Sequence, residues 1–137
     1  MFQWKDAYSC NIAEIDKQHR NLLEIGARLY DIIRNQKDFD YYDDVLAIFN
    51  ELQDYAVYHF GYEENLMKQY GYEEFEEHKK EHQQFVDKLK EAAKKDIDEE
   101  LFNISLDLAT FIADWIEHHI LRSDKKYKDF FNAKGVF

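Results

Sequence analysis

Helix-breaking residues are scarce in this 137-residue chain, which contains no proline and only four glycines. Such a composition favours long helices, because proline and glycine are the residues that most often end them. Cys10 is the only cysteine, which excludes an intrachain disulfide, a cysteine-based zinc site and a four-cysteine iron–sulfur cluster. No apolar run reaches the roughly 18 residues that indicate a membrane-spanning helix.

Acidic residues outnumber basic ones, 29 against 18, and the formal net charge is −11. This charge disfavours nucleic acids and anionic membrane surfaces as partners, because their phosphates would be repelled. The first ten residues are mixed and polar, unlike a signal peptide, so we expect a cytoplasmic protein. With 45% apolar residues the chain can bury an ordinary core, and we expect a single domain over 1–137.

Apolar residues recur every three or four positions in four stretches, the first of which contains Ile15, Leu22 and Leu29. This period is typical of amphipathic helices rather than strands, so the predicted fold class is all-α. Aromatic residues near the two ends are available for docking onto the helices: Trp4, Tyr127, Phe130 and Phe131. We expect helices at about 12–37, 41–69, 73–94 and 98–120 or beyond, with flanking segments 1–11 and 125–137.

Short polar connections are expected at Asp38–Asp40, around Gly71 and at Lys95–Asp98. Gly71 suits a left-handed helix end, and Asp96 or Asp98 can cap the start of the fourth helix. Because short connections force consecutive helices to run in opposite directions, the sequence predicts an antiparallel up-down-up-down four-helix bundle.

Histidines occupy interior positions of these apolar faces, at least one in each predicted helix. A lone histidine there is usually a satisfied core residue, but several imidazoles together with a carboxylate have too few hydrogen-bond partners unless a metal binds them. The residues in question are His19, His59, His78, His82 and His119, with Glu63 one turn after His59. We therefore predict a metal site inside the bundle.

The number and type of these ligands favour two adjacent ions over one. Nitrogen and carboxylate ligands without thiolate suit iron or manganese, with zinc as a competitor. Ferritin-like di-iron bundles use Glu-x-x-His motifs. Here no histidine has a glutamate three positions earlier, and only Asp16 precedes His19 at that interval. The predicted site is therefore richer in imidazole than those sites are.

An ordered set of motifs connects these residues along the chain. The set comprises IDKQH at Ile15–His19, HF at His59–Phe60, EE at Glu63–Glu64, LM at Leu66–Met67, HxxxH at His78–His82, WI at Trp115–Ile116, and HIxxxDxxY from His119 to Tyr127. In this order and spacing the chain resembles the bacterial hemerythrins from Trp4 to about Tyr127. The resemblance implies a non-haem di-iron centre that binds O2 reversibly.

The resemblance also implies a division of ligands between two iron ions (Fe2+/Fe3+) that share a bridging oxo or hydroxo group. His78, His82 and His119 would bind one ion and leave it coordinatively full. His19 and His59 would bind the other ion, which would keep one open position for O2. Glu63 and Asp124 would bridge the two. Asp124 lies five residues after His119, about 140° around an ideal helix, so this assignment depends on the resemblance and not on periodicity.

By the same resemblance an apolar O2 pocket would be lined by Leu23, Phe60, Trp115, Ile116 and Ile120. The helix stripe selects His119 over His118, which we expect to be solvated. Partners that orient the imidazoles cannot be identified from the sequence, although Asp16, Gln18 and several tyrosines are candidates. Cys10 is expected to be an incidental small apolar residue.

The expected function is reversible O2 binding for carriage, storage or local delivery, without enzymatic activity and with an unknown protein as a further candidate recipient of O2. One alternative is a di-iron enzyme or sensor acting on peroxide or nitric oxide. Others are an iron-handling or repair protein and a structural bundle that binds adventitious zinc.

Overall fold

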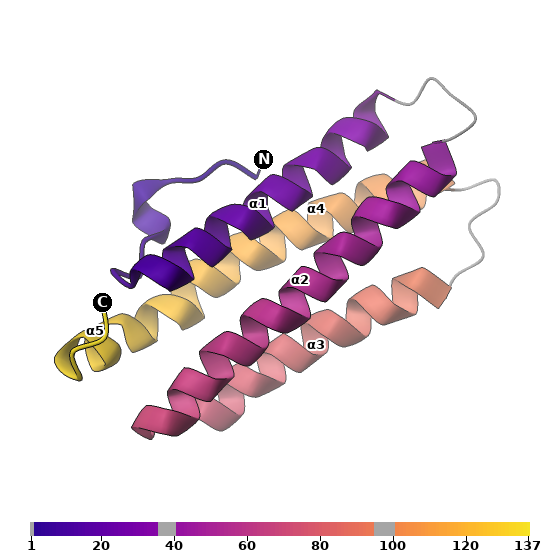
Figure 1. Cartoon of the computed structure of the whole chain (residues 1–137). Helices are drawn as coiled ribbons and strands as arrows, with labels where there is room; N and C mark the ends of the chain where they lie inside the picture. Colours follow the sequence, from indigo (N-terminus) through magenta and orange to yellow (C-terminus); the bar gives the residue numbers. More distant parts are fainter. Residues whose placement is uncertain (1, 36–40, 95–100) are drawn as a thin grey trace.

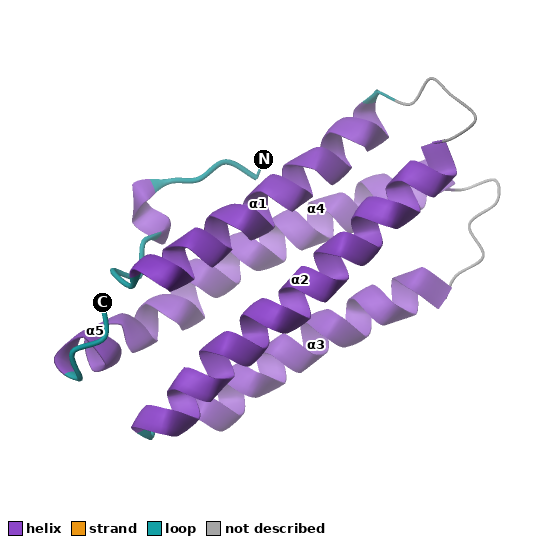
Figure 2. Cartoon of the chain, viewed as in Figure 1, coloured by secondary structure: helices purple, strands orange, loops and turns teal. Residues whose placement is uncertain are grey.

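Four long helices pack side by side in the computed structural model, which describes residues 2–35, 41–94 and 101–137 (Figure 1). The main helices are α1 (Ala13–Arg34), α2 (Tyr41–Tyr70), α3 (Phe75–Lys94) and α4 (Leu101–His119). Consecutive helices run in opposite directions, and every regular element in the described ranges is helical (Figure 2). The predicted all-α up-down-up-down four-helix bundle is therefore confirmed.

The chain continues in helical form beyond α4, past the predicted helix at 98–120 or beyond and into the expected flanking segment 125–137. A π-helical segment, η2 (Ile120–Asp124), leads directly into α5 (Lys125–Ala133). Most of the flank after residue 124 is therefore a helix, which buries Tyr127 and Phe131. At the other end, a short 3-10 turn, η1 (Asp6–Tyr8), precedes α1.

Gly71 ends α2, as its sequence context predicts. Its φ of +70° is in the left-handed region, where glycine carries no Cβ penalty. The Tyr72 amide donates to the Met67 carbonyl at 2.9 Å and the Gly71 amide to the Lys68 carbonyl at 3.4 Å, which is the paired pattern of a Schellman motif. The expected connections at Asp38–Asp40 and Lys95–Asp98, with the Asp96 and Asp98 caps, lie outside the described residues.

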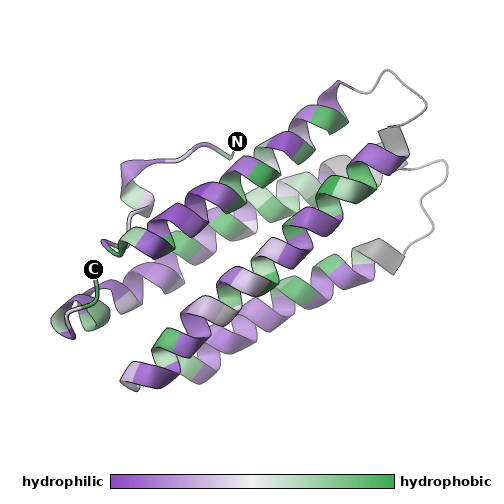
Figure 3. Ribbon diagram, viewed as in Figure 1, coloured by the Kyte–Doolittle hydropathy of each residue, from purple (hydrophilic) through white to green (hydrophobic). Residues whose placement is uncertain are grey.

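Hydrophobic and hydrophilic residues alternate along the helices (Figure 3), and most of the buried residues in the described ranges are apolar. The buried apolar residues form two clusters, one large and one small. Along α1 the larger cluster holds Leu22 and the smaller one Ile15, and His19 lies between them. Along α2 Phe60 and Met67 belong to the larger and smaller clusters, and Glu63 lies between them. A polar layer thus separates two apolar parts of the core.

The N-terminal segment packs against α1 at a position where the helix has no side chain. The ring of Phe2 lies over Gly26, and a Cβ at that glycine would overlap the ring. Phe2 is itself buried in the larger cluster. Gly26 is therefore required for the close approach of this segment. None of the helices in the described ranges has the length and hydropathy needed to cross a membrane.

Candidate metal centre

Seven ionisable side chains from four helices and η2 converge in the polar layer. Each has a relative exposure of 6% or less. They are His19 from α1, His59 and Glu63 from α2, His78 and His82 from α3, His119 from α4, and Asp124 from η2. All seven residues that the sequence and the resemblance single out as ligand candidates thus lie in one cluster.

The cluster divides into two groups that share one carboxylate. One ligand atom each from His78, His82, His119 and Asp124 lie within 4.8 Å of one another. The same limit holds for His19, His59, Glu63 and Asp124. One group therefore has three imidazoles, whereas the other has two.

Asp124 presents one oxygen to each group. Its Oδ2 lies 2.9 Å from His19 Nε2, and its Oδ1 lies 2.9 Å from His78 Nε2 and 3.1 Å from His119 Nε2. This is the arrangement of a carboxylate that can connect two metal positions.

Glu63, from α2, likewise directs one oxygen toward each group. Its Oε1 contacts His59 Nε2 and lies 3.8 Å from His19 Nε2, whereas its Oε2 lies 3.6 Å from His78 Nε2. The hydroxyl of Tyr127 donates to Oε2 at 2.9 Å and fixes the carboxylate in this orientation. Both acidic ligand candidates can thus serve the two groups together.

The π-helical turn explains how Asp124 reaches the cluster. In a regular α-helix, five residues would rotate its side chain about 140° away from His119. In η2 the Lys125 amide donates to the Ile120 carbonyl, five residues earlier, so the turn holds an extra residue. The side chains of Ser123 and Asp124 are consequently buried next to His119.

Several buried polar atoms in the cluster have no hydrogen-bond partner within the described part of the chain. They include Nε2 of His19 and His78, Oε1 of Glu63 and both carboxylate oxygens of Asp124. In addition, His82 Nε2 and His119 Nε2 face each other at 3.0 Å, although only one of them can donate a proton to the other. Cations placed among these atoms satisfy them all, so the donor set fits a metal centre.

The two carboxylates also determine the charges of the imidazoles when no metal is bound. Burial alone would lower the pKa of His78, but Asp124 and Glu63 outweigh it and raise that pKa to about 10. Burial and Asp124 likewise act in opposite directions on His119, whose pKa rises to about 9. The pKa of His82 is lowered by burial. The metal-free cluster therefore contains protonated and neutral imidazoles side by side.

Three of the imidazoles direct Nδ1 at a fixed oxygen. His59 donates to Gln18 Oε1 at 2.7 Å, and His82 donates to Glu64 Oε2 at 3.3 Å. His119 donates to Glu81 Oε2 at 2.8 Å. Such contacts set the tautomer and leave Nε2 free to bind a metal.

Only some of these partners were among the sequence candidates. Gln18 was one of them, whereas Asp16 accepts hydrogen bonds from Ser9 Oγ at 2.6 Å and the Cys10 amide at 2.8 Å and holds the turn before α1. Tyrosines were candidates only as a group, and Tyr127 contacts the carboxylate of Glu63. Glu64 and Glu81 were missed, because their contacts cross between helices and leave no signal in the spacing of one helix.

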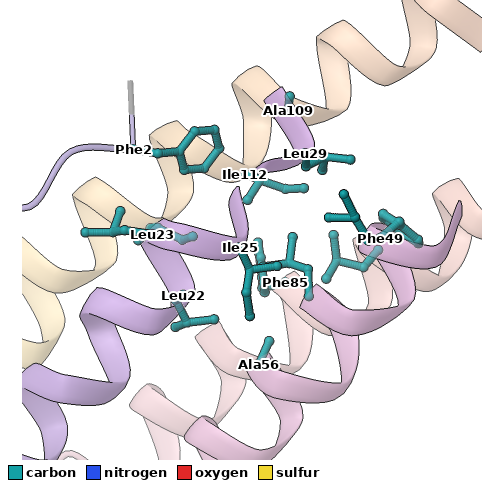
Figure 4. Packing of buried hydrophobic residues seen from close by; sticks show 14 of the residues in the cluster. Phe2, Leu22, Leu23, Ile25, Leu29, Phe49, Ala56, Phe85, Ala109 and Ile112 are labelled. Atoms are coloured by element: carbon teal, nitrogen blue, oxygen red, sulfur yellow. The ribbon is translucent and has the colours of Figure 1, made fainter. Parts of the chain in front are cut away.

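A small cavity lies on the side of the group that has two imidazoles. Its volume is about 10 Å³, close to the minimum that holds one water molecule. Its lining consists of His19, Leu22, His59, Phe60, Trp115, Ile116, His119, Ile120 and Asp124. Four of the five predicted pocket residues are in this set. Leu23 is buried but does not line the cavity, whereas Leu22 projects from α1 on the side of Ala56 and does so (Figure 4).

Two further expectations concern residues near the cluster. His118 is exposed, and its Nδ1 donates to the Asp114 carbonyl at 2.7 Å, so it points away from the site as predicted. Cys10 lies within 4.8 Å of nitrogen and oxygen atoms of His19 and Asp16, and it is fully buried. Burial raises the pKa of the Cys10 thiol, which makes it a poor metal ligand.

The fold and the cluster define a class of protein: a helical bundle with a histidine- and carboxylate-rich metal centre in its core. Residues 10–131 match the family model described as the hemerythrin HHE cation binding domain. The chain belongs to the hemerythrin family.

Individual relatives agree with this assignment. A bacteriohemerythrin of Clostridium acetobutylicum is 36% identical over 94% of this chain and 100% of its own length. A bacteriohemerythrin of Methylococcus capsulatus is 30% identical over 93% and 94% of the two chains. A solved structure of a hemerythrin point mutant superposes with a TM-score of 0.77 at 26% identity, covering 93% of this chain and 94% of that one.

Proposed function

We propose that the protein binds O2 reversibly at a centre of two iron ions. The observation that carries this proposal is the inequality of the two ligand groups. His78, His82 and His119 with Asp124 and Glu63 can supply five ligands to one ion, whereas the group of His19 and His59 has one imidazole fewer. The apolar cavity lies beside that second group.

In this proposal His78, His82 and His119 hold one ion, and His19 and His59 hold the other. Glu63 and Asp124 would bind both, and the centre would include an oxo or hydroxo group from solvent. Two iron ions held in this way supply the electrons and the open coordination position that reversible O2 binding requires.

The apolar walls of the cavity keep the binding reversible. Phe60, Ile116 and Ile120 are each 4% exposed or less, and they exclude bulk water. Every ionisable side chain that lines the cavity is itself a ligand candidate. A proton donor that could drive a reduced oxygen species off the site is therefore lacking among the described lining residues, and this favours a carrier over an enzyme acting on peroxide.

The proposal extends to the setting in which the protein acts. We infer a single domain that works in the cytoplasm, where a net charge of −11 keeps it soluble and away from nucleic acids. O2 is the proposed ligand, and the protein stores it, carries it or delivers it to a recipient.

One experiment tests the function directly. The apoprotein is loaded with ferrous iron without air, exposed to air and then purged with argon, while its absorption spectrum is recorded. A coloured form that appears in air and fades under argon supports a carrier. A colour that persists, or steady consumption of added peroxide, would contradict it. His59→Ala should abolish the colour change, and His118→Ala, an exposed neighbour of the site, should preserve it.

A further inference from the structure

Glu81 connects a buried ligand candidate to the surface of the bundle. Its Oε2 accepts the proton of His119 Nδ1 at 2.8 Å and the hydroxyl proton of Ser123 at 2.5 Å. The His119 side chain is 4% exposed, whereas that of Glu81 is 46% exposed. The carboxylate therefore approaches the cluster from outside and is not itself positioned as a ligand.

The contact with Glu81 determines what His119 offers to a metal. In the neutral imidazole, a proton held on Nδ1 by the carboxylate leaves the lone pair on Nε2, and His119 Nε2 lies 3.1 Å from Asp124 Oδ1 inside the cluster. A negatively charged acceptor also pushes electron density into the ring, which strengthens it as a ligand.

Ser123 keeps this carboxylate in place. A half-exposed glutamate can rotate into solvent, and the 2.5 Å hydrogen bond from the Ser123 hydroxyl opposes that rotation. Ser123 faces inward because it belongs to η2, the same π-helical turn that brings Asp124 to the cluster. The π-helical turn thus brings Asp124 to the cluster and also places Ser123, which holds the carboxylate that supports His119.

The two ligand groups differ in the charge of these supports. In the group with three imidazoles, His82 and His119 donate to the carboxylates of Glu64 and Glu81. In the other group, His59 donates to the neutral amide of Gln18, whose own nitrogen donates to Glu14 at 3.1 Å. The structure consequently provides more negative charge behind the imidazoles of the first group.

We propose that Glu81 is a positioning residue of the metal centre, held by Ser123, which fixes His119 as a strong ligand and favours the higher oxidation state at the position bound by three imidazoles. This inference deepens the proposed function and rests on it for the identity of the metal. It does not depend on the binding of O2.

Zinc alone is the probe, because its binding can be measured without redox chemistry. We expect Glu81→Gln to weaken one of the two zinc-binding steps about 10- to 100-fold. Glu77→Gln is the matched control. Glu77 is exposed and lies one turn earlier on α3. Its replacement by glutamine removes the same charge, and the zinc affinity of that variant should stay within about twofold of the wild type. Ser123→Ala should weaken the same zinc-binding step, but less than Glu81→Gln does. Ser123→Thr keeps the hydroxyl and should bind zinc in that step as the wild type does.

A second readout separates positioning from a general effect on folding. In the zinc-loaded protein, the Nδ1 proton of His119 should give a strongly downfield, slowly exchanging NMR signal that moves upfield in Glu81→Gln only. In the iron-loaded protein, the reduction potential should rise in Glu81→Gln and stay constant in Glu77→Gln.

Equal zinc affinities, NMR signals and potentials in the Glu81 and Glu77 variants would overturn the proposal. A selective loss in Glu81→Gln would support it even if the iron-loaded wild type failed to bind O2 reversibly. That second failure would contradict the proposed function alone.

Discussion

Protons and metal ions compete for the same nitrogens in the ligand cluster. Asp124 and Glu63 stabilise protonated imidazoles when no metal is present, and a metal has to displace those protons. At His82 the opposite holds, because burial outweighs its carboxylate partner and lowers its pKa. The charge of each side chain is therefore set by its neighbours more than by its residue type.

Metal binding should release protons at neutral pH. The pKa of His78 is raised to about 10, that of His119 to about 9, and that of His19 well above its ordinary value. All three imidazoles are then protonated at pH 7, so filling both positions with zinc should release about three protons per chain. Calorimetric titrations in buffers of different ionisation enthalpy measure this number. It should fall as the pH rises through 9 to 10, and a number that is zero at pH 7 or grows with pH would be inconsistent with the cluster.

An acid placed in the cavity should make the iron-loaded protein oxidise irreversibly. Ile120 is 2% exposed and lines the cavity, whereas Leu121, the next residue, is 39% exposed. Ile120→Glu supplies a proton donor in the dry pocket and should speed oxidation of the O2-bound form about 100-fold. Leu121→Glu adds the same group to the surface and should have little effect. Equal lifetimes measured by absorbance in the two variants would rule out a protective dry pocket.

The sequence identifies individual residues only where their spacing reports their environment. His19, His59, His78, His82 and His119 could be predicted because each interrupts an apolar stripe. Glu64 and Glu81 could not, since an exposed glutamate on a helix is indistinguishable from a solvated one until the neighbouring helix is placed. Leu22 and Leu23 follow His19 by three and four residues, and periodicity does not choose between them.

At the scale of elements, regular helices could be predicted and the irregular one could not. The predicted bounds 41–69 and 73–94 differ by one or two residues from α2 and α3. The π-helical turn η2 has no signature in apolar periodicity, so Asp124 was assigned by resemblance alone. The same turn buries Ser123, which no sequence pattern indicated.

The docking of the N-terminal segment on α1 can be tested through Gly26. Alanine is the better helix former by about 1 kcal/mol, but a Cβ would displace the Phe2 ring, whose burial contributes about 1.5–3 kcal/mol. We therefore expect Gly26→Ala to lower the free energy of unfolding of the apoprotein by about 1 kcal/mol in urea denaturation. In a Phe2→Ala background the same substitution should raise it. If Gly26→Ala changed the free energy of unfolding in the same direction in both backgrounds, Phe2 would not occupy this position.

At the scale of the whole molecule, the bundle surrounds a polar layer with apolar residues on both sides. The larger apolar cluster provides the walls of the cavity through Phe60, Ile116 and Ile120. The smaller one contains Tyr127, which orients Glu63. Each of the four long helices contributes at least one ligand candidate, so folding of the bundle brings these side chains together.

The central claim is that seven side chains of one chain hold two iron ions. The most direct measurement is the iron content per chain after anaerobic loading with ferrous iron and removal of unbound metal. We expect two irons per chain in the wild type, because the cluster contains two ligand groups that share Asp124. Saturation at one iron per chain, or at none, would contradict the account.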